Sequence, residues 1–236
     1  LRDLAEESIL LPSINRAEVI YNGIDQQAFG LQPKAAARRR LGLPEHGKII
    51  LMVGANVSGN HVKGYSVGLR ACELCANLMG KDDTIRLVAL GGAASISQRG
   101  SLIVDVREPT SELSKIASYY QAADVFLHPA LMDNLPTTII ESLSCGTPVV
   151  ASSVGGIPEM IVDIREDAAN GYGWLSEAGD VDELADILRQ VLGDYALREL
   201  ASSRSYHVAR ARFSDAEMAK QYFRLYKDLC GTDILD

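Results

Sequence analysis

Short apolar runs alternate with amphipathic runs from Lys48 to Leu192, and this alternation constrains the fold more than any other feature of the sequence. The first run, residues 48–54 (KIILMVG), is apolar without interruption, which is typical of a strand in a parallel sheet covered on both faces. Helices are expected between this strand and further strands at residues 85–92, 101–106, 124–130, 148–154 and 171–175. Such βαβ units form right-handed crossovers, so the sequence predicts an α/β fold with a doubly wound parallel sheet flanked by helices.

We expect a single domain over residues 1–236, because residues 48–192 contain no repeat, low-complexity stretch or linker. This domain is predicted to consist of an N-terminal segment (residues 1–30), a core (residues 48–192) and C-terminal helices (residues 195–230). In the N-terminal segment we expect a short helix and then an edge strand at residues 17–25, which closes on an Asn22-Gly23 turn with positive φ.

The charge balance excludes some classes of partner. The sequence has 31 acidic and 23 basic residues and a formal net charge of −8, which argues against broad binding to nucleic acid or to an anionic membrane.

No apolar run approaches the ~20 residues that span a bilayer, and no signal segment opens the sequence. Cys72 and Cys75 lie one turn apart in an amphipathic run, where packing explains them better than a metal or redox site. We expect a cytoplasmic protein with reduced cysteines.

The stretch from Asp133 to Glu141 follows the strand at residues 124–130 and therefore lies at a strand's carboxyl end, where ligands of such sheets bind. A helix is predicted to open near Pro136 or Thr137, so that the free N–H groups of Thr137 and Thr138 could hold a phosphate. Glu141, one turn further on, could accept two ribose hydroxyls, and Asp133 would reach toward a sugar beyond a diphosphate. Alternatively, Asp133 and Thr137 only cap a core helix and Glu141 is a surface acid; the local sequence leaves both interpretations open.

The glycine-containing loop that follows the first core strand is a second candidate for phosphate binding. Residues 54–66 read GANVSGNHVKGYS, and the ammonium group of Lys63 would oppose the charge of a diphosphate. The loop is neither a Walker A loop nor a GxGxxG motif, which argues against P-loop and nicotinamide functions. The alternative is a solvated loop with a surface lysine.

Other polar and aromatic residues have structural explanations. Asp180 and Asp182 open an amphipathic helix, where capping is a better explanation than a metal-nucleotide site. His128 is expected to be packed and hydrogen bonded, and the aromatic rings of Trp174, Tyr119 and Tyr120 are predicted to pack in the core.

Taken together, these segments resemble glycosyltransferase family 4, specifically the carboxyl-terminal donor-binding domain of its retaining enzymes of the GT-B architecture. The resemblance runs almost from end to end and rests on the joint order of its pieces, which are VIYNGID, GANVSGNHVKG, YYQAADVFLHPA, the Asp133 to Glu141 stretch, ESLSCGTPVVASSVGGIPE and QYFRLY. It implies that the chain is one Rossmann-like half of a GT-B enzyme. The amino-terminal acceptor domain would then be absent from this sequence, which begins at Leu1 without a methionine and looks like part of a longer chain.

The resemblance also implies roles for individual residues. Glu141 would bind the nucleotide ribose, Lys63 would neutralise the diphosphate, and the amides of Thr137 and Thr138 would hold phosphate oxygens. Asp133 stands where the family usually has a glutamate that contacts the donor sugar, so Asp133 and Lys63 are the expected catalytic residues. The segment from Val104 to Arg107 is placed to contact the base, and further donor-binding residues are expected at Gly54, His61, Val106, Asn134 and Leu135.

The implied reaction is transfer of a sugar from a nucleoside diphosphate to an acceptor hydroxyl with retention of anomeric configuration, without a bound metal or other cofactor. Many members carry an arginine after the first core strand, whereas this chain has Ala55 and Asn56, so more of the leaving-group charge would rest on Lys63. Cell-surface polysaccharide or glycolipid synthesis is the expected pathway, and any peripheral membrane contact is expected only through the missing half. The alternatives are a nucleotide-sugar 2-epimerase of GT-B architecture and a non-catalytic nucleotide-binding module.

Overall fold

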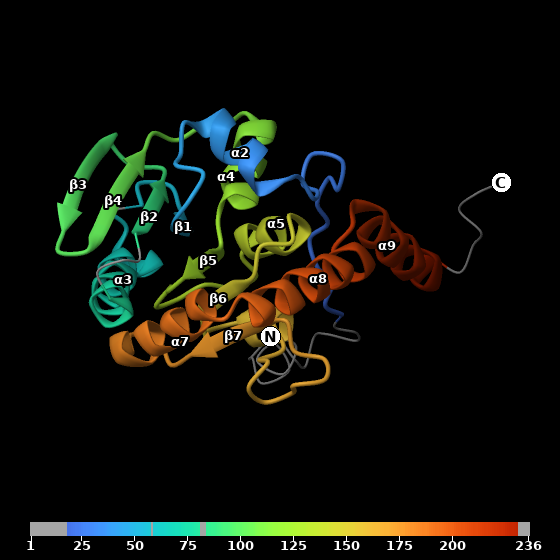
Figure 1. Ribbon diagram of the computed structural model, residues 1–236. Helices are drawn as coiled ribbons and strands as arrows, with labels where there is room; N and C mark the ends of the chain where they lie inside the picture. Colours follow the sequence, from blue (N-terminus) through green and yellow to red (C-terminus); the bar gives the residue numbers. More distant parts are fainter. Residues whose placement is uncertain (1–17, 58, 81–83, 231–236) are drawn as a thin grey trace.

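A seven-stranded sheet forms the centre of the protein in a computed structural model that describes residues 18–57, 59–80 and 84–230 (Figure 1). The strand order is β3-β4-β2-β1-β5-β6-β7. The strands are β1 (Lys48–Val53), β2 (Ile85–Leu90), β3 (Ser95–Arg99), β4 (Leu102–Arg107), β5 (Val125–His128), β6 (Val149–Ser152) and β7 (Gly173–Ser176). From β1 the chain first adds strands on one side of the sheet, and from β5 onward it adds strands on the other side. This is the predicted doubly wound topology.

One strand of this sheet departs from the prediction of an all-parallel sheet. β3, which the apolar pattern did not indicate, pairs antiparallel with β4 and forms the edge of the sheet, whereas the other neighbouring strands pair in parallel. All five residues of β3 are exposed, so it lacks the apolar signal of a buried strand. The chain reverses at Gly100, whose φ of +59° suits the two-residue turn between β3 and β4.

Helices cover both faces of the sheet, and the strands distribute their side chains between two core clusters. In β1, Ile49 and Leu51 belong to one cluster, and Ile50 and Met52 belong to the other, as the alternation of side chains in a strand requires. Residues of α2 (Lys34–Leu41), α4 (Leu113–Ala122) and α5 (Thr137–Ser144) pack in the first cluster; residues of α3 (Tyr65–Met79) and α7 (Val181–Gly193) pack in the second. The short helices are η2 (His61–Lys63) and α6 (Ile157–Met160).

The residues that were predicted to pack in the core are buried, and the predicted helix cap at Asp180 is confirmed. Cys72 and Cys75 are fully buried in α3, and Trp174 and Tyr120 are also fully buried. Tyr119 is 4% exposed. Asp180 caps α7, because its carboxylate accepts a hydrogen bond from the backbone N–H of Glu183.

The prediction for the N-terminal segment is wrong where it can be examined. Residues 1–17, with the helix expected there, lie outside the described residues. In the described part of the strand expected at residues 17–25, which is residues 18–25, there is only a single bridge, between Ile24 and Ser214. Neither Asn22 nor Gly23 adopts a positive φ. Gly23 instead permits a close contact, since a Cβ atom there would lie 2.5 Å from the Cα of Asp215.

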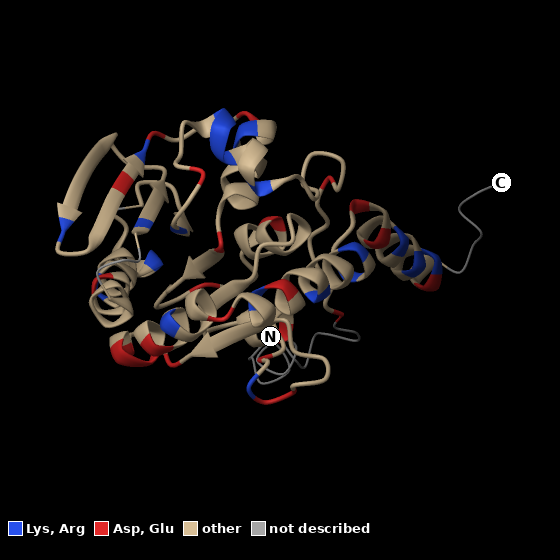
Figure 2. Ribbon diagram, in the orientation of Figure 1, with Lys and Arg blue, Asp and Glu red and all other residues tan. Residues whose placement is uncertain are grey.

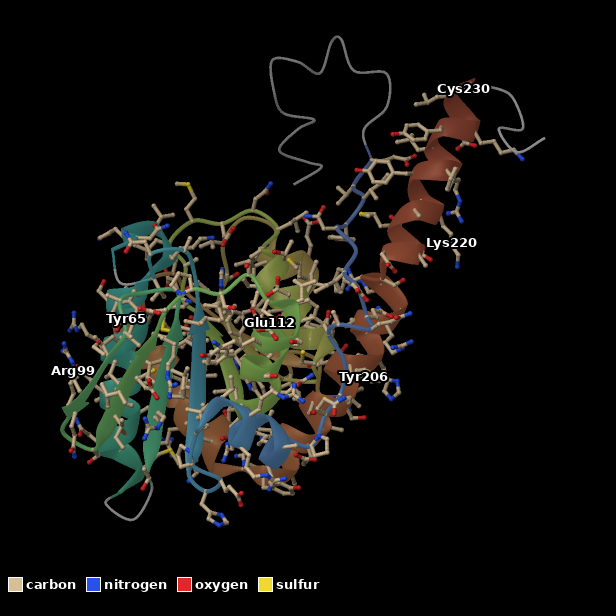
Figure 3. The ribbon with its side chains drawn as sticks, turned by 90° about the horizontal axis from the view of Figure 1, so that it is seen from above. Tyr65, Arg99, Glu112, Tyr206, Lys220 and Cys230 are labelled. Atoms are coloured by element: carbon tan, nitrogen blue, oxygen red, sulfur yellow. The ribbon has the colours of Figure 1, made fainter. Side chains whose placement is uncertain are left out.

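The last helices leave the body of the protein. α8 (Tyr195–Arg212) crosses the α/β layers, and α9 (Asp215–Cys230) then projects outward, with Cys230 at its far end (Figure 3). Among its described residues, α9 buries none. No helix in the described part of the chain is long and apolar enough to cross a membrane.

Candidate functional site

The loop after β1 is held against the segment that follows β5, at the carboxyl edge of the sheet. Gly64 has a φ of +69°, and a Cβ atom there would lie 1.8 Å from the carbonyl oxygen of Pro129. The backbone N–H of Leu131 donates to the carbonyl oxygen of Val62 at 2.9 Å. Tyr65, labelled in Figure 3, begins α3 directly after this loop. The glycine therefore permits a close backbone approach that brings Lys63 to the end of β5.

Lys63 and His128 both bind the carboxylate of Asp133. The Nζ atom of Lys63 lies 2.7 Å from Oδ2 of Asp133, and Nε2 of His128 lies 2.9 Å from the same oxygen. The other oxygen, Oδ1, accepts the backbone N–H of Asn134 at 2.9 Å. Burial opposes ionisation of Asp133, but the hydrogen bonds from His128 and Lys63 outweigh it and hold the pKa of this carboxyl well below its usual range. Asp133 is therefore an ionised carboxylate with two basic partners on one oxygen.

A third loop, after β6, fixes the backbone around Asp133. Gly155 has a φ of +55°, and a Cβ atom there would lie 1.9 Å from the carbonyl oxygen of Asp133. The N–H of Gly156 donates to the carbonyl oxygen of Asn134 at 2.9 Å. The Gly-Gly turn is thus required by a close approach of two backbones, and it sets the position of the segment that leads into α5.

The N-terminus of α5 carries donors that the helix itself does not use. α5 begins at Thr137 after Pro136, and no side chain in the described residues caps it. The capping alternative for Asp133 and Thr137 is therefore wrong, because Asp133 binds the N–H of Asn134 instead. Thr137 is exposed and Thr138 is partly exposed, and the first N–H groups of a helix have no intrahelical partner. The Oγ1 atom of Thr138 is buried without a hydrogen-bond partner among the described residues.

Glu141 is not a free surface acid. The hydroxyl of Tyr120 donates to its Oε2 at 2.8 Å. Burial raises the pKa of Glu141, and the hydrogen bond from Tyr120 works in the opposite direction by stabilising the ionised form. Tyr120 is fully buried and fixes the position of one oxygen of this carboxylate.

The remaining predicted residues are distributed along the same edge. Gly54 directly follows β1, and its N–H donates to the carbonyl oxygen of Leu90 at 3.1 Å. His61 and Asn134 are exposed, and Leu135 is partly exposed. The side chain of Val106 packs in the second core cluster, so the structure does not direct it toward Lys63 or Asp133.

Sequence reasoning did not identify two of the contacts within this site. His128 was correctly expected to be packed and hydrogen bonded, but its partner could not be named; it is 4% exposed and binds Asp133. Tyr120 was expected only to fill the core, whereas its hydroxyl orients Glu141. No spacing rule pairs these residues, although a polar tip on a buried aromatic ring is itself a signal that a partner exists.

Three cavities in the described part of the chain lie away from this site. Cavities of about 580 and 690 Å³ flank Arg165 and Glu183, and one of about 190 Å³ lies beside Asp124 and Cys145. None of these three is lined by Lys63, Asp133 or Glu141.

Comparisons with known proteins show which family this chain belongs to. The model of the family "Glycosyl transferases group 1" matches residues 33–208. The D-inositol 3-phosphate glycosyltransferase of Thermobispora bispora is 31% identical over 224 residues, which cover 88% of this chain and 50% of that protein. The chain thus spans about half of the length of the curated relatives it matches.

Solved structures share the fold. Sucrose-phosphate synthase from Thermosynechococcus elongatus has a TM-score of 0.74 at 23% identity, over 98% of this chain and 57% of that chain. The Anabaena protein HepE, solved in complex with UDP-glucose, has a TM-score of 0.71 at 20% identity, over 89% of this chain and 57% of that chain. Because the family model covers most of the sequence, from the start of α2 to within α8, this chain belongs to the group 1 glycosyltransferases.

Proposed function

We propose that this chain is the carboxyl-terminal, donor-binding domain of a retaining glycosyltransferase of family 4, and that it binds a nucleoside-diphosphate sugar. The observation that carries the proposal is the meeting of three loops at the carboxyl edge of the sheet, which places Lys63 on Asp133 just before the uncapped start of α5. An ammonium group and free helix amides together form a receptor for a diphosphate.

Each part of the donor has a partner in this arrangement. The first-turn amides at Thr137 and Thr138 and the ammonium of Lys63 would bind the diphosphate. The carboxylate of Glu141, held by Tyr120, would accept the ribose hydroxyls. The backbone from Val104 to Arg107 would contact the base, and Asp133 would contact the transferred sugar. Gly54, His61, Asn134 and Leu135 would complete the walls of the donor site.

Catalysis would consist mainly of stabilising the departing diphosphate. As the bond between the anomeric carbon and the diphosphate breaks, negative charge grows on the leaving oxygens. Lys63 and the positive end of the α5 dipole would oppose this charge without a metal ion or other cofactor. The acceptor hydroxyl would be supplied from the half of the enzyme that is missing from this sequence, and it would attack on the face that the leaving group occupied, with retention of configuration.

The comparisons favour this substrate class. HepE was solved in complex with UDP-glucose, and the curated relatives are named D-inositol 3-phosphate glycosyltransferases. An acceptor site would lie largely in the missing half, so we propose only a hydroxyl acceptor, in cell-surface polysaccharide or glycolipid synthesis on the cytoplasmic side. We expect this chain alone to bind a donor but to transfer it poorly.

Titration calorimetry of this chain with UDP, GDP, UDP-glucose and GDP-mannose tests the proposal. At least one should bind with submillimolar affinity, and Lys63→Ala should weaken that binding. Lys220→Ala serves as the matched control, because Lys220 is 73% exposed on the projecting helix α9. Absence of binding at millimolar ligand would reject the function. In the full-length enzyme, transfer of a labelled sugar distinguishes a transferase from an epimerase, which would invert C2 of the donor instead.

A further inference from the structure

Asp133 is bound by two basic groups that differ in their freedom to move. The side chain of Lys63 is 34% exposed and belongs to a short loop helix, whereas that of His128 is 5% exposed and lies in β5. The ring of His128 also packs beside Phe126, with ring centroids 5.9 Å apart. Lys63 can therefore leave the carboxylate by rotating its flexible side chain, and His128 cannot.

A diphosphate and Asp133 would compete for the same ammonium group. Lys63 lies 2.7 Å from Oδ2 of Asp133, and to bind the diphosphate its ammonium group would move away from this oxygen. The side chain of Asp133 is only 13% exposed, and a carboxylate with so little access to water is destabilised when its partner leaves. The release of Lys63 would be unfavourable if nothing else bound Oδ2.

From these contacts, and on the basis of the proposed function, we infer that His128 is a positioning residue that keeps Asp133 satisfied while Lys63 moves to the diphosphate. His128 donates from Nε2 to the oxygen that Lys63 vacates, and the N–H of Asn134 continues to hold Oδ1. Asp133 thus keeps two of its three donors and stays oriented toward the sugar. Asp133 in turn holds Lys63 at the site.

A double-mutant cycle separates this role from simple support of the fold. The variants are His128→Leu, Asp133→Asn and the combination of both, and the measurement is the affinity of each for UDP by titration calorimetry. His128→Leu should weaken UDP binding about tenfold, since a hydrogen bond to a charged group is lost just when Lys63 must leave. Asp133→Asn should bind UDP at least as tightly as the wild type, because it removes the competitor for Lys63.

The combined variant gives the decisive result. If His128 acts through Asp133, then adding His128→Leu to Asp133→Asn should change the affinity for UDP less than about twofold. His128→Gln, whose Nε2 can donate from a similar position, should recover most of the lost affinity. Melting temperatures of all variants identify any that fail to fold.

Three other outcomes would overturn the inference, and they can be told apart. If the wild type binds UDP and His128→Leu weakens binding equally in both backgrounds, His128 has only a structural role. If His128→Leu has no effect on UDP binding although the wild type binds it, Asp133 does not need the imidazole. If the wild type binds none of the nucleotides tested, the proposed function itself is rejected, and the inference is rejected with it.

Discussion

Two aspartates flank strand β5, and each accepts hydrogen bonds from two basic side chains and one backbone N–H. Asp124 precedes the strand and binds Lys34 at 2.6 Å, Arg38 at 2.8 Å and the N–H of Ile49 at 2.8 Å. Asp133 follows the strand and binds Lys63, His128 and the N–H of Asn134 at 2.7–2.9 Å. In composition the two clusters are almost the same, although they lie at opposite ends of the strand.

The clusters differ in how firmly their basic groups are held. The side chain of Arg38 is 4% exposed, and it also donates to the carbonyl oxygens of Ala122, Glu45 and Gly47. Figure 2 shows basic residues along the ribbon of α2, and Arg38 is one of those in its last turn. The side chain of Lys63, by contrast, is one-third exposed on a loop and forms an ion pair with Asp133. A basic group that is held firmly on its carboxylate stabilises the fold, and a basic group that can move can leave its carboxylate for an anionic ligand.

The largest effect expected from this comparison is on stability. Asp124→Ala leaves the buried guanidinium of Arg38 without its carboxylate, and we expect the free energy of unfolding to fall by about 3–5 kcal/mol. Urea unfolding of the variant and the wild type measures this fall in the free energy of unfolding. Asp133→Asn, with a more exposed partner, should cost about 1 kcal/mol or less. Equal losses in the two variants would mean that the clusters do not differ as argued.

The second effect is on function. Lys63→Ala removes the movable ammonium, and we expect kcat/KM of the full-length enzyme to fall about 10²- to 10³-fold, the usual result of deleting one donor to a developing charge. The free energy of unfolding should change by less than about 1 kcal/mol, because Lys63 is partly exposed. Steady-state kinetics measure the fall in kcat/KM, and urea unfolding of the same preparation measures the change in stability. Near-wild-type kinetics would remove Lys63 from the mechanism.

A smaller effect concerns the second acid of the site. Tyr120→Phe deletes the hydroxyl that stabilises ionised Glu141, so the pKa of Glu141 should rise further above its ordinary value. A protonated Glu141 accepts ribose hydroxyls less well. As the pH is lowered, the Tyr120→Phe variant should therefore lose UDP binding at a higher pH than the wild type does. At neutral pH the affinity should fall about threefold to tenfold. Calorimetry between pH 5 and 8 measures both, and Glu141→Gln, which cannot titrate, should abolish this pH dependence. If Tyr120→Phe does not shift the acidic side of the pH profile of UDP binding, the assignment of Glu141 is wrong.

The smallest expected effect is that of metal removal. Since Lys63 and the start of α5 are proposed to oppose the leaving-group charge, treatment of the full-length enzyme with EDTA should leave kcat unchanged. The control is a parallel assay with added Mg²⁺. A loss of activity that Mg²⁺ restores would show that the ammonium and the helix amides do not suffice.

Much of the fold follows from local pattern. The parallel strands and most of the helices were predicted from the sequence, because side-chain alternation and connection length are properties of short segments. β3 was not predicted, since all five of its residues are exposed and its only signal is the turn at Gly100. The prediction of a strand at residues 17–25 was wrong for the opposite reason. Its apolar pattern fits a strand, but among its described residues only Ile24 forms a β-bridge, with Ser214.

The sequence by itself determined that the loops after β1, β5 and β6 share one edge of the sheet, because parallel strands place their carboxyl ends together. It also supplied the residue types of the proposed diphosphate site, Lys63, Asp133 and Glu141. The partner of each carboxylate was decided only by the tertiary structure. Lys63 meets Asp133 from 70 positions away, Arg38 meets Asp124 from 86, and Tyr120 meets Glu141 from 21. Such pairings depend on which backbones can approach closely, as at Gly64 and Gly155, and no local pattern encodes that distance.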